Sequence, residues 1–230
     1  MFASLEDRLA LQDLTAVVPV GLLVSKLADS PFIELNAGMR WRLGYANSSG
    51  AAFTSMRVID VLPWNNDPVN SGNQFDGGFS GGQIGPLAVG EHLAFTTNSA
   101  PADINRNPNC VSNGGSLPDG QGACPAQGAQ WSPTGGTIPA GTTAIRIDDL
   151  NGLPANAGQT LTLDLSTQGN RAGNVYENSF TAVAPGESLA VATTKVQVRV
   201  PAAELRGYVY ADFDDNGSPS GADRGIGPCC

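Results

Sequence analysis

One short acidic stretch near the end of the chain carries the residue types that bind a hard cation. The segment "DFDDNGSPSGAD" places acid or amide side chains at its first, third and fifth positions, a glycine at the sixth and an acid at the twelfth. In EF-hand-type sites this spacing gathers oxygen atoms around one Ca²⁺. The predicted calcium ligands are Asp212, Asp214, Asn216, Ser218 (through its backbone carbonyl), Ser220 and Asp223.

The pattern has one departure and one alternative interpretation. Asp223 stands where EF-hand loops carry glutamate, and its shorter side chain usually donates one oxygen rather than two, which predicts weaker binding or a preference for a smaller ion. The alternative is an acidic Asn-Gly turn, Asn216-Gly217, with solvated aspartates and no metal.

The residues around this loop resemble the opening of a repeat domain. The segment "LRGYVYADFDDNGSPSGADRGIG" is similar to the start of the B-type repeats of bacterial surface proteins, the SdrD B-like and Cna B-type modules. These begin with a strand, here 207–210, pass through an Asp/Asn calcium loop, and enter the next strand at a Gly-Ile step, here Gly225-Ile226. The resemblance implies that residues 201–230 hold a linker and the truncated start of a second β module.

Two of the four cysteines lie in one Gly/Asn/Pro-rich segment, "NPNCVSNGGSLPDGQGACPAQG". No histidine lies nearby to complete a zinc site, so a disulfide between Cys110 and Cys124 is favoured over metal binding. A disulfide predicts an oxidising, extracellular compartment. Cys229 and Cys230 are adjacent, and a bond between neighbours is strained, so they either pair with other chains or stay free.

The composition disfavours nucleic acids and lipid bilayers as partners. The net charge is −9, and Lys26 and Lys195 are the only lysines, so electrostatic binding to a polyanion is not expected. The run "LTAVVPVGLLVSKLA" is too short, and too broken by Pro19 and Gly21, to span a membrane. The start "MFASLEDRLALQDL" lacks the basic end of a signal peptide. We therefore expect no membrane insertion here, and a chain that is a piece of something longer.

The elements that position these residues are predicted to be β-strands, because 29 glycines and 16 prolines disfavour long helices. In "MRWRLGYAN", strict alternation places Met39, Trp41, Leu43 and Tyr45 on one face. The strand-like segments are 39–47, 53–63, 91–97, 142–148, 159–166, 175–183 and 188–200. The first two flank the small-residue turn "SSGA" and predict an antiparallel hairpin.

The predicted fold is all-β. Residues 1–30 are an N-terminal segment with a short helix and an apolar strand, and residues 31–200 are an Ig-like antiparallel β-sandwich with long loops. Within the sandwich, residues 64–90 are expected to form surface loops with one short strand. Residues 98–141, here named the excursion, are too long for a simple turn and are expected to be a surface feature.

A second resemblance supports this architecture. The segment "LNAGMRWRLGYANSSGAAFTSMRVIDVLPWN" is similar to the Ig-like repeat of prokaryotic surface proteins known as domain of unknown function eleven. Gly38, Asn47, Asp60, Leu62 and Pro63 carry the resemblance. It implies a secreted, multi-domain, cell-surface protein and no particular activity.

An active site has little support in the sequence. The single histidine, His92, lies in a strand-like segment, and no GxSxG nucleophile elbow occurs. Glu177 and Asp164 would be the carboxylates of a glycosidase-like pair, but alternating strands favour surface acids. Trp64 and Trp131 lie in loops and are candidate ligand contacts, whereas Trp41 is expected in the core.

Two functions from different classes follow. The first is a structural component of an extracellular stalk, sheath or filament, with calcium stiffening the junction to the next domain and with neighbouring domains or copies of the same protein as partners. The alternative is an adhesin or carbohydrate-binding module that uses loops 64–90 and 98–141 to bind a glycan or protein ligand. We do not expect an enzyme.

Overall fold

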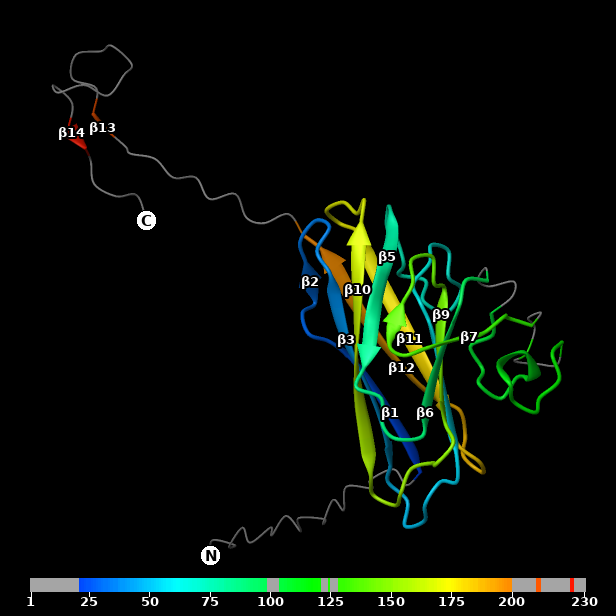
Figure 1. Cartoon of the computed structure of the whole chain (residues 1–230). Coiled ribbons are helices and arrows are strands. Elements are labelled where there is room, and N and C mark those ends of the chain that lie inside the picture. The colour runs from blue at the N-terminus through cyan, green and yellow to red at the C-terminus, as the bar shows by residue number, and fades with distance from the viewer. Residues whose placement is uncertain are drawn as a thin grey trace, which may run out of the picture. The chain divides into compact units, whose positions relative to one another are not determined.

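The computed structural model describes residues 21–98, 104–120, 124, 128–199, 210–211 and 224–225. The chain divides into two compact units, residues 1–199 and 200–230. Figure 1 shows the first unit as two β-sheets packed face to face. No α-helix occurs among the described residues, and the predicted all-β, Ig-like sandwich is confirmed. The helix expected near the start lies outside these residues.

The first sheet has five strands. In spatial order they are β1 (Leu22–Ala28), β3 (Met39–Asn47), β10 (Gly158–Gln168), β5 (Gly78–Gly85) and β8 (Thr137–Ile138). All four neighbouring pairs are antiparallel. The apolar strand predicted within residues 1–30 is β1, and it forms one edge of this sheet.

The second sheet has seven strands. In spatial order they are β2 (Phe32–Ile33), β12 (Ala190–Val198), β11 (Val175–Val183), β4 (Met56–Val61), β9 (Ala144–Asp149), β6 (Glu91–Thr96) and β7 (Ser132–Thr134). The pairs are antiparallel except that β2 runs parallel to β12.

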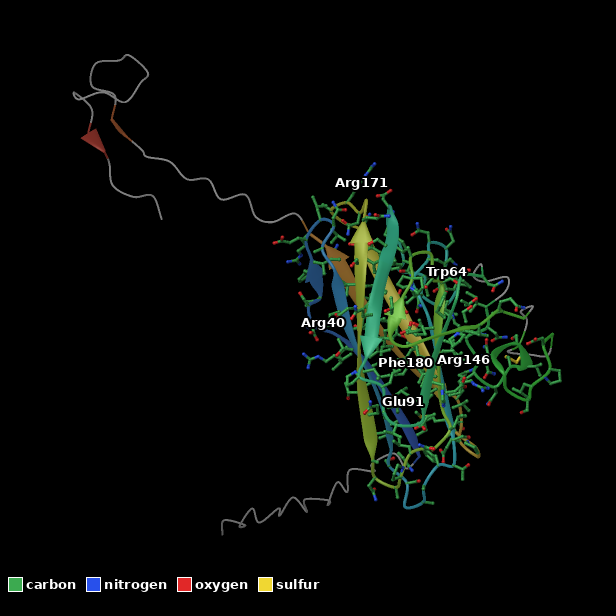
Figure 2. The ribbon with its side chains drawn as sticks, viewed as in Figure 1. Arg40, Trp64, Glu91, Arg146, Arg171 and Phe180 are labelled. Atoms are coloured by element: carbon green, nitrogen blue, oxygen red, sulfur yellow. A yellow bond between two sulfur atoms is a disulfide. The ribbon has the colours of Figure 1, made fainter. Side chains whose placement is uncertain are left out.

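The core lies between the sheets and follows the alternation of the sequence. Met39, Trp41, Leu43 and Tyr45 are all at most 2% exposed, as their period of two predicts. They pack in one apolar cluster with inward residues of both sheets. Figure 2 shows Phe180 of β11 inside the sandwich.

The predicted hairpin of residues 39–47 and 53–63 is wrong. The two strands exist as β3 and β4, but β3 pairs with β1 and β10 whereas β4 pairs with β11 and β9. The turn between them therefore crosses from one sheet to the other. Both strands carry a mainly apolar inward face, interrupted in β4 by Asp60, and packing these faces against each other buries more surface than pairing them edge to edge.

Glycine-rich residues 78–85 form an eight-residue strand, longer than the short strand expected within loops 64–90. A Cβ at Gly82 would lie 2.0 Å from the carbonyl oxygen of Asp164 on the neighbouring β10. Glycine is therefore required for the close approach of β5 to β10. The excursion likewise contributes β8 to one sheet and β7 to the other.

One ion pair lies inside the apolar core and joins the two sheets. Lys26 Nζ on β1 donates to Asp60 Oδ2 on β4, and neither side chain has exposed surface. The ammonium lies 5.0 Å from the ring centroid of Trp41 and 5.8 Å from that of Phe180. Burial lowers the pKa of Lys26 to about 8, while the Asp60 carboxylate opposes the shift. Because a buried charge requires a partner, the pair fixes which face of β1 points inward.

Replacement Asp60→Ala is expected to lower the free energy of unfolding by about 3–5 kcal/mol, because it leaves Lys26 in the core without its partner. The matched control is Asp164→Ala, which removes the partner of Arg40 at the surface, where the side chains are 44% and 55% exposed. The control is expected to lose about 0–1 kcal/mol. Urea unfolding followed by tryptophan fluorescence measures both. Equal losses in the two variants would show that the buried pair has no special importance.

Candidate functional site

The predicted calcium ligands of residues 212–223 lie outside the described residues. The structure does describe the two short strands that flank them, β13 (Tyr210–Ala211) and β14 (Arg224–Gly225). These strands pair antiparallel, with Tyr210 opposite Gly225 and Ala211 opposite Arg224. Ala211 and Arg224, the described residues that flank the acidic segment, are therefore neighbours.

A second candidate region is the excursion, which covers part of the outer face of the seven-stranded sheet (Figure 1). This face of β4 carries Ile59 and Val61, each at most 2% exposed. Together with Ile104 of the excursion and Ala144 of β9 they form a second apolar cluster. β4 is thus apolar on both faces, and the outer face requires a cover.

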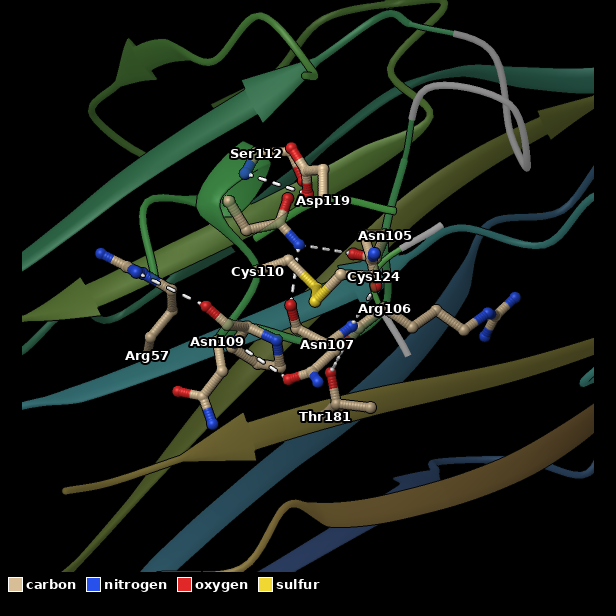
Figure 3. Close-up of a disulfide and its surroundings, with 12 residues drawn as sticks. Arg57, Asn105, Arg106, Asn107, Asn109, Cys110, Ser112, Asp119, Cys124 and Thr181 are labelled. Carbon is tan, nitrogen blue, oxygen red and sulfur yellow. Dashed lines mark hydrogen bonds between the residues drawn. A yellow bond between two sulfur atoms is a disulfide. The ribbon is translucent and has the colours of Figure 1, made fainter. Parts of the chain in front are cut away.

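The excursion is held together by a disulfide and a ladder of asparagines (Figure 3). Cys110 and Cys124 are bonded, with their Cα atoms 5.5 Å apart and no exposed surface. A short 3₁₀ turn, η1 (Val111–Asn113), follows Cys110. The amide of Asn113 donates to the carbonyl oxygens of Asn105 and Asn107 at 2.7 and 3.0 Å. These bonds give a segment without long strands a defined shape.

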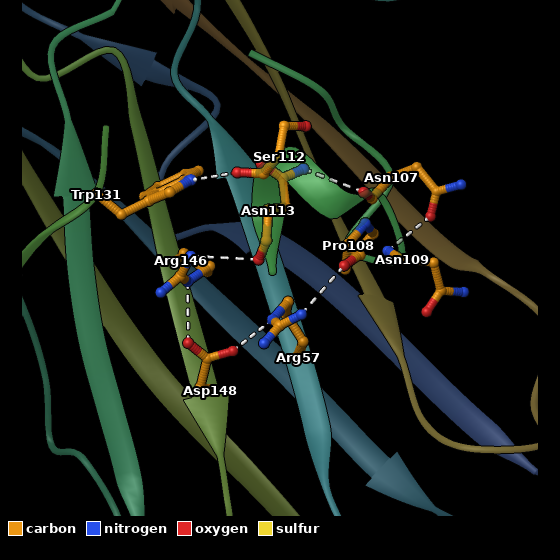
Figure 4. A network of polar contacts seen from close by, with 9 residues as sticks. All are labelled: Arg57, Asn107, Pro108, Asn109, Ser112, Asn113, Trp131, Arg146 and Asp148. Carbon is orange, nitrogen blue, oxygen red and sulfur yellow. Dashed lines mark hydrogen bonds and ion pairs between the residues drawn. The ribbon is translucent and has the colours of Figure 1, made fainter. Parts of the chain in front are cut away.

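A shared carboxylate fastens the excursion to the sheet (Figure 4). Asp148 on β9 accepts from Arg57 Nε, and its other oxygen lies 2.9 Å from Arg146 Nε. Arg146 Nη1 in turn donates to the carbonyl oxygen of Asn113 at 3.2 Å. Burial lowers the pKa of Arg146, and Asp148 opposes this shift. Both arginines reach the backbone of the excursion, since Arg57 Nη1 donates to the carbonyl oxygen of Pro108 at 3.5 Å.

The candidate contact Trp131 belongs to this attachment. Its indole Nε1–H donates to the carbonyl oxygen of Ser112 at 3.2 Å, and the Arg146 guanidinium lies 5.0 Å from its ring centroid. The ring is half-buried against the second apolar cluster. The structure therefore gives Trp131 a packing role.

Trp64 is also half-buried in the second cluster, and the guanidinium of Arg106 lies 4.7 Å from its ring centroid. Arg106 is held by Asp67, whose side chain has no exposed surface. Trp64 lines a surface hollow of about 460 Å³ together with Phe75, Phe79 and a few polar groups. The hollow therefore combines aromatic rings with a few polar groups.

A sulfur and carboxylate grouping lies at the disulfide. The ligand-type atoms of Cys110, Asp119 and Cys124 lie within 4.8 Å of one another. The two sulfur atoms are bonded to each other, so they offer no thiolate to a metal. Asp119 accepts from the hydroxyl of Ser112 at 2.8 Å. One carboxylate is too few for Ca²⁺, which takes six to eight oxygen ligands, and the grouping does not fit calcium.

The two carboxylates considered for glycosidase chemistry do not form a pair. Asp164 lies on β10 of the five-stranded sheet and binds Arg40 at the surface. Glu177 lies on β11 of the seven-stranded sheet, 3.3 Å from Lys195, and accepts from the backbone of Gly72 at 2.8 Å. His92 on β6 is exposed. The described residues thus give no support to an acid–base pair built from these groups.

Sequence reasoning gave no role to Lys26. The signals were present, because Lys26 is one of two lysines and sits in an apolar run, and Asp60 interrupts an apolar strand. Their convergence depends on how the two sheets pack, which no local pattern reports.

A scan against models of known protein families gives no match, and a search of curated proteins gives none either. Similar solved structures include the seventh ScaB type I cohesin of Pseudobacteroides cellulosolvens, at 8% identity and a TM-score of 0.39, covering 83% of this chain and 100% of that one. The major pilin SpaD of Corynebacterium diphtheriae has 10% identity and a TM-score of 0.39, and the match covers 76% of this chain and 34% of the pilin.

A third similar structure is AvmM, described as catalysing macrocyclization in alchivemycin A biosynthesis. It has 8% identity and a TM-score of 0.35, and the match covers 82% of this chain and 94% of AvmM. Likeness at this level says nothing of activity. Among the described residues, no helix has the length and hydrophobicity needed to cross a bilayer.

The double replacement Cys110→Ser with Cys124→Ser is expected to destabilise the protein by about 3 kcal/mol in the loop-entropy model. We expect limited proteolysis to cut first within the excursion, because the strands of the sandwich keep their own pairing. The matched control is Cys229→Ser with Cys230→Ser, which leaves the disulfide intact and should not change the cleavage pattern. The same cleavage rate in both double variants would contradict a structural role for the disulfide.

Proposed function

We propose that the chain is a structural component of an extracellular surface assembly, such as a stalk, sheath or filament, with a calcium-stiffened junction to the next domain. The observation that carries the proposal is how the polar side chains are used. Asp60 ties β4 to β1 of the opposite sheet, and Asp148 ties β9 to β4. The partners are neighbouring domains or copies of the same protein.

The calcium junction rests on spacing and on the pairing of β13 with β14. The oxygen ligands Asp212, Asp214, Asn216, Ser218, Ser220 and Asp223 are proposed to surround one Ca²⁺. The paired residues Ala211 and Arg224 flank the acidic segment, which supports a loop between them. Binding energy would then oppose unfolding of the second unit, because an ion that binds only the folded form stabilises it.

Isothermal titration of Ca²⁺ into the chelator-treated full chain tests this junction. We expect saturable binding of one ion, and its loss in Asp212→Ala with Asp214→Ala, because both remove acidic ligands from one loop. The matched control is Asp76→Ala with Asp164→Ala, two exposed aspartates of the sandwich. The control should keep full binding. No saturable heat up to millimolar calcium, or equal loss in both double variants, would contradict the junction.

The adhesin or carbohydrate-binding alternative is favoured by one observation, the aromatic hollow at Trp64. Under this function Trp64→Ala removes a stacking surface and should abolish retention on an immobilised polysaccharide. The control Val89→Ala changes an apolar side chain that is 92% exposed and lies outside the hollow. If the unmodified chain is retained by none of a panel of immobilised polysaccharides, the carbohydrate-binding function is contradicted.

A further inference from the structure

Three polar side chains are buried in the apolar core on strands that lie next to or across from one another. Lys26 comes from β1 of the five-stranded sheet, whereas Asp60 and Asn178 come from the neighbouring strands β4 and β11 of the other sheet. The side chains of Lys26 and Asp60 have no exposed surface, and Asn178 is 0% exposed.

The strand register places Asn178 beside the buried ion pair. Asp60 lies opposite Phe180 in the β4–β11 ladder, and Asn178 precedes Phe180 by two residues on the same inward face. Asn178 is therefore the diagonal neighbour of Asp60, a relation in which side chains reach each other. β1 packs against β11, and Lys26 Nζ lies 5.8 Å from the Phe180 ring centroid. The amine, the carboxylate and the amide share one region.

Asn178 differs from other buried amides of this protein. Neither its Oδ1 nor its Nδ2 has a hydrogen-bond partner within the described part of the chain, and Asp60 Oδ1 also has none. Asn47, which is 1% exposed, instead donates to the carbonyl oxygens of Ala51 and Leu153. A fully buried amide without partners is costly, which calls for a functional reason.

We propose that Lys26 and Asn178 form an intramolecular amide cross-link, with Asp60 transferring the protons. The ammonium of Lys26 gives a proton to Asp60, and the neutral amine attacks Cγ of Asn178 to form a new C–N bond. Asp60 then moves one proton from the attacking nitrogen to the amide nitrogen. The original C–N bond of Asn178 breaks and ammonia leaves. Nothing is oxidised or reduced, and no further reactant is required.

The surroundings favour each part of this reaction. The apolar core disfavours charge, and burial lowers the pKa of Lys26 to about 8, which makes the neutral amine accessible. Asp60 touches the reacting nitrogen, as a general acid–base group must. Trp41 and Phe180 lie beside the amine and keep water away from it. The folded sandwich holds amine and amide in place, which replaces a bimolecular encounter.

The cross-link would join the edge strand β1 to β11, an internal strand of the opposite sheet. Force applied to the chain ends could then not separate the two sheets between these points. The inference stands apart from calcium binding, since it uses residues of the first unit alone.

Mass spectrometry of the unmodified full chain, reduced and denatured, is the test. The expected mass is lower than the sequence mass by one ammonia, and a protease digest should yield one branched peptide that joins Lys26 to Asn178. The digest needs no variant, so a folding failure cannot obscure the result. An unlinked Lys26 peptide would overturn the proposal. Loss of one water, with Lys26 joined to Asp60, would overturn the assignment of Asn178.

Variants then test the roles of the three residues. Lys26→Arg, Asn178→Ala and Asp60→Ala should each show the full mass of their sequence, with no branched peptide. The matched control is Lys195→Arg, which changes the other lysine at a site that is 62% exposed and should retain the cross-link. Cross-linking that persists at full extent in folded Asp60→Ala would overturn the role of Asp60.

Discussion

The buried pair of Lys26 and Asp60 is the interaction on which assembly of the sandwich depends, and the proposed cross-link would form from it. A buried ammonium is stable only when a carboxylate lies within bonding distance of it. Its partner comes from the opposite sheet, so the pair aligns the sheets as well as neutralising a charge. β1 is an edge strand that pairs only with β3. A shift of β1 by one residue would turn Lys26 and the inward apolar side chains toward solvent, and the pair with Asp60 opposes that shift.

The outer face of the seven-stranded sheet imposes a second constraint. Ile59 and Val61 make this face of β4 apolar, and the excursion covers it. A cover without long strands needs other restraints, and these are the disulfide, the asparagine ladder and the two arginines that share Asp148. Several of these polar contacts connect segments that are distant in sequence, as Arg57 does with Asp148 and Pro108. This use of polar groups suits a structural module.

Local patterns predicted the strands, and the packing of the sheets decided what the patterns could not. β3 spans residues 39–47 and β11 spans residues 175–183, as alternation predicts. The hairpin prediction was wrong because a short turn can join two strands that pair in one sheet or two strands that lie in opposite sheets. β5 was underestimated because its glycines serve a close strand contact rather than a turn. Cys110 and Cys124 were found because they share one segment, whereas Lys26, Asp60 and Asn178 come near one another only through the packing of the strands. Trp64 and Trp131 were expected in loops as candidate ligand contacts, and both rings pack against an arginine and the second cluster.

The central claim is that the first unit is a mechanically restrained module whose two sheets cannot be pulled apart. Single-molecule stretching of the full chain by its two ends tests this claim most directly. A cross-linked sandwich would release only the residues before Lys26 and after Asn178, at roughly 3.5 Å per residue, and Lys26→Arg would release the intervening segment as well. Release of the whole sandwich from the unmodified chain, with the same extension in Lys26→Arg, would contradict it.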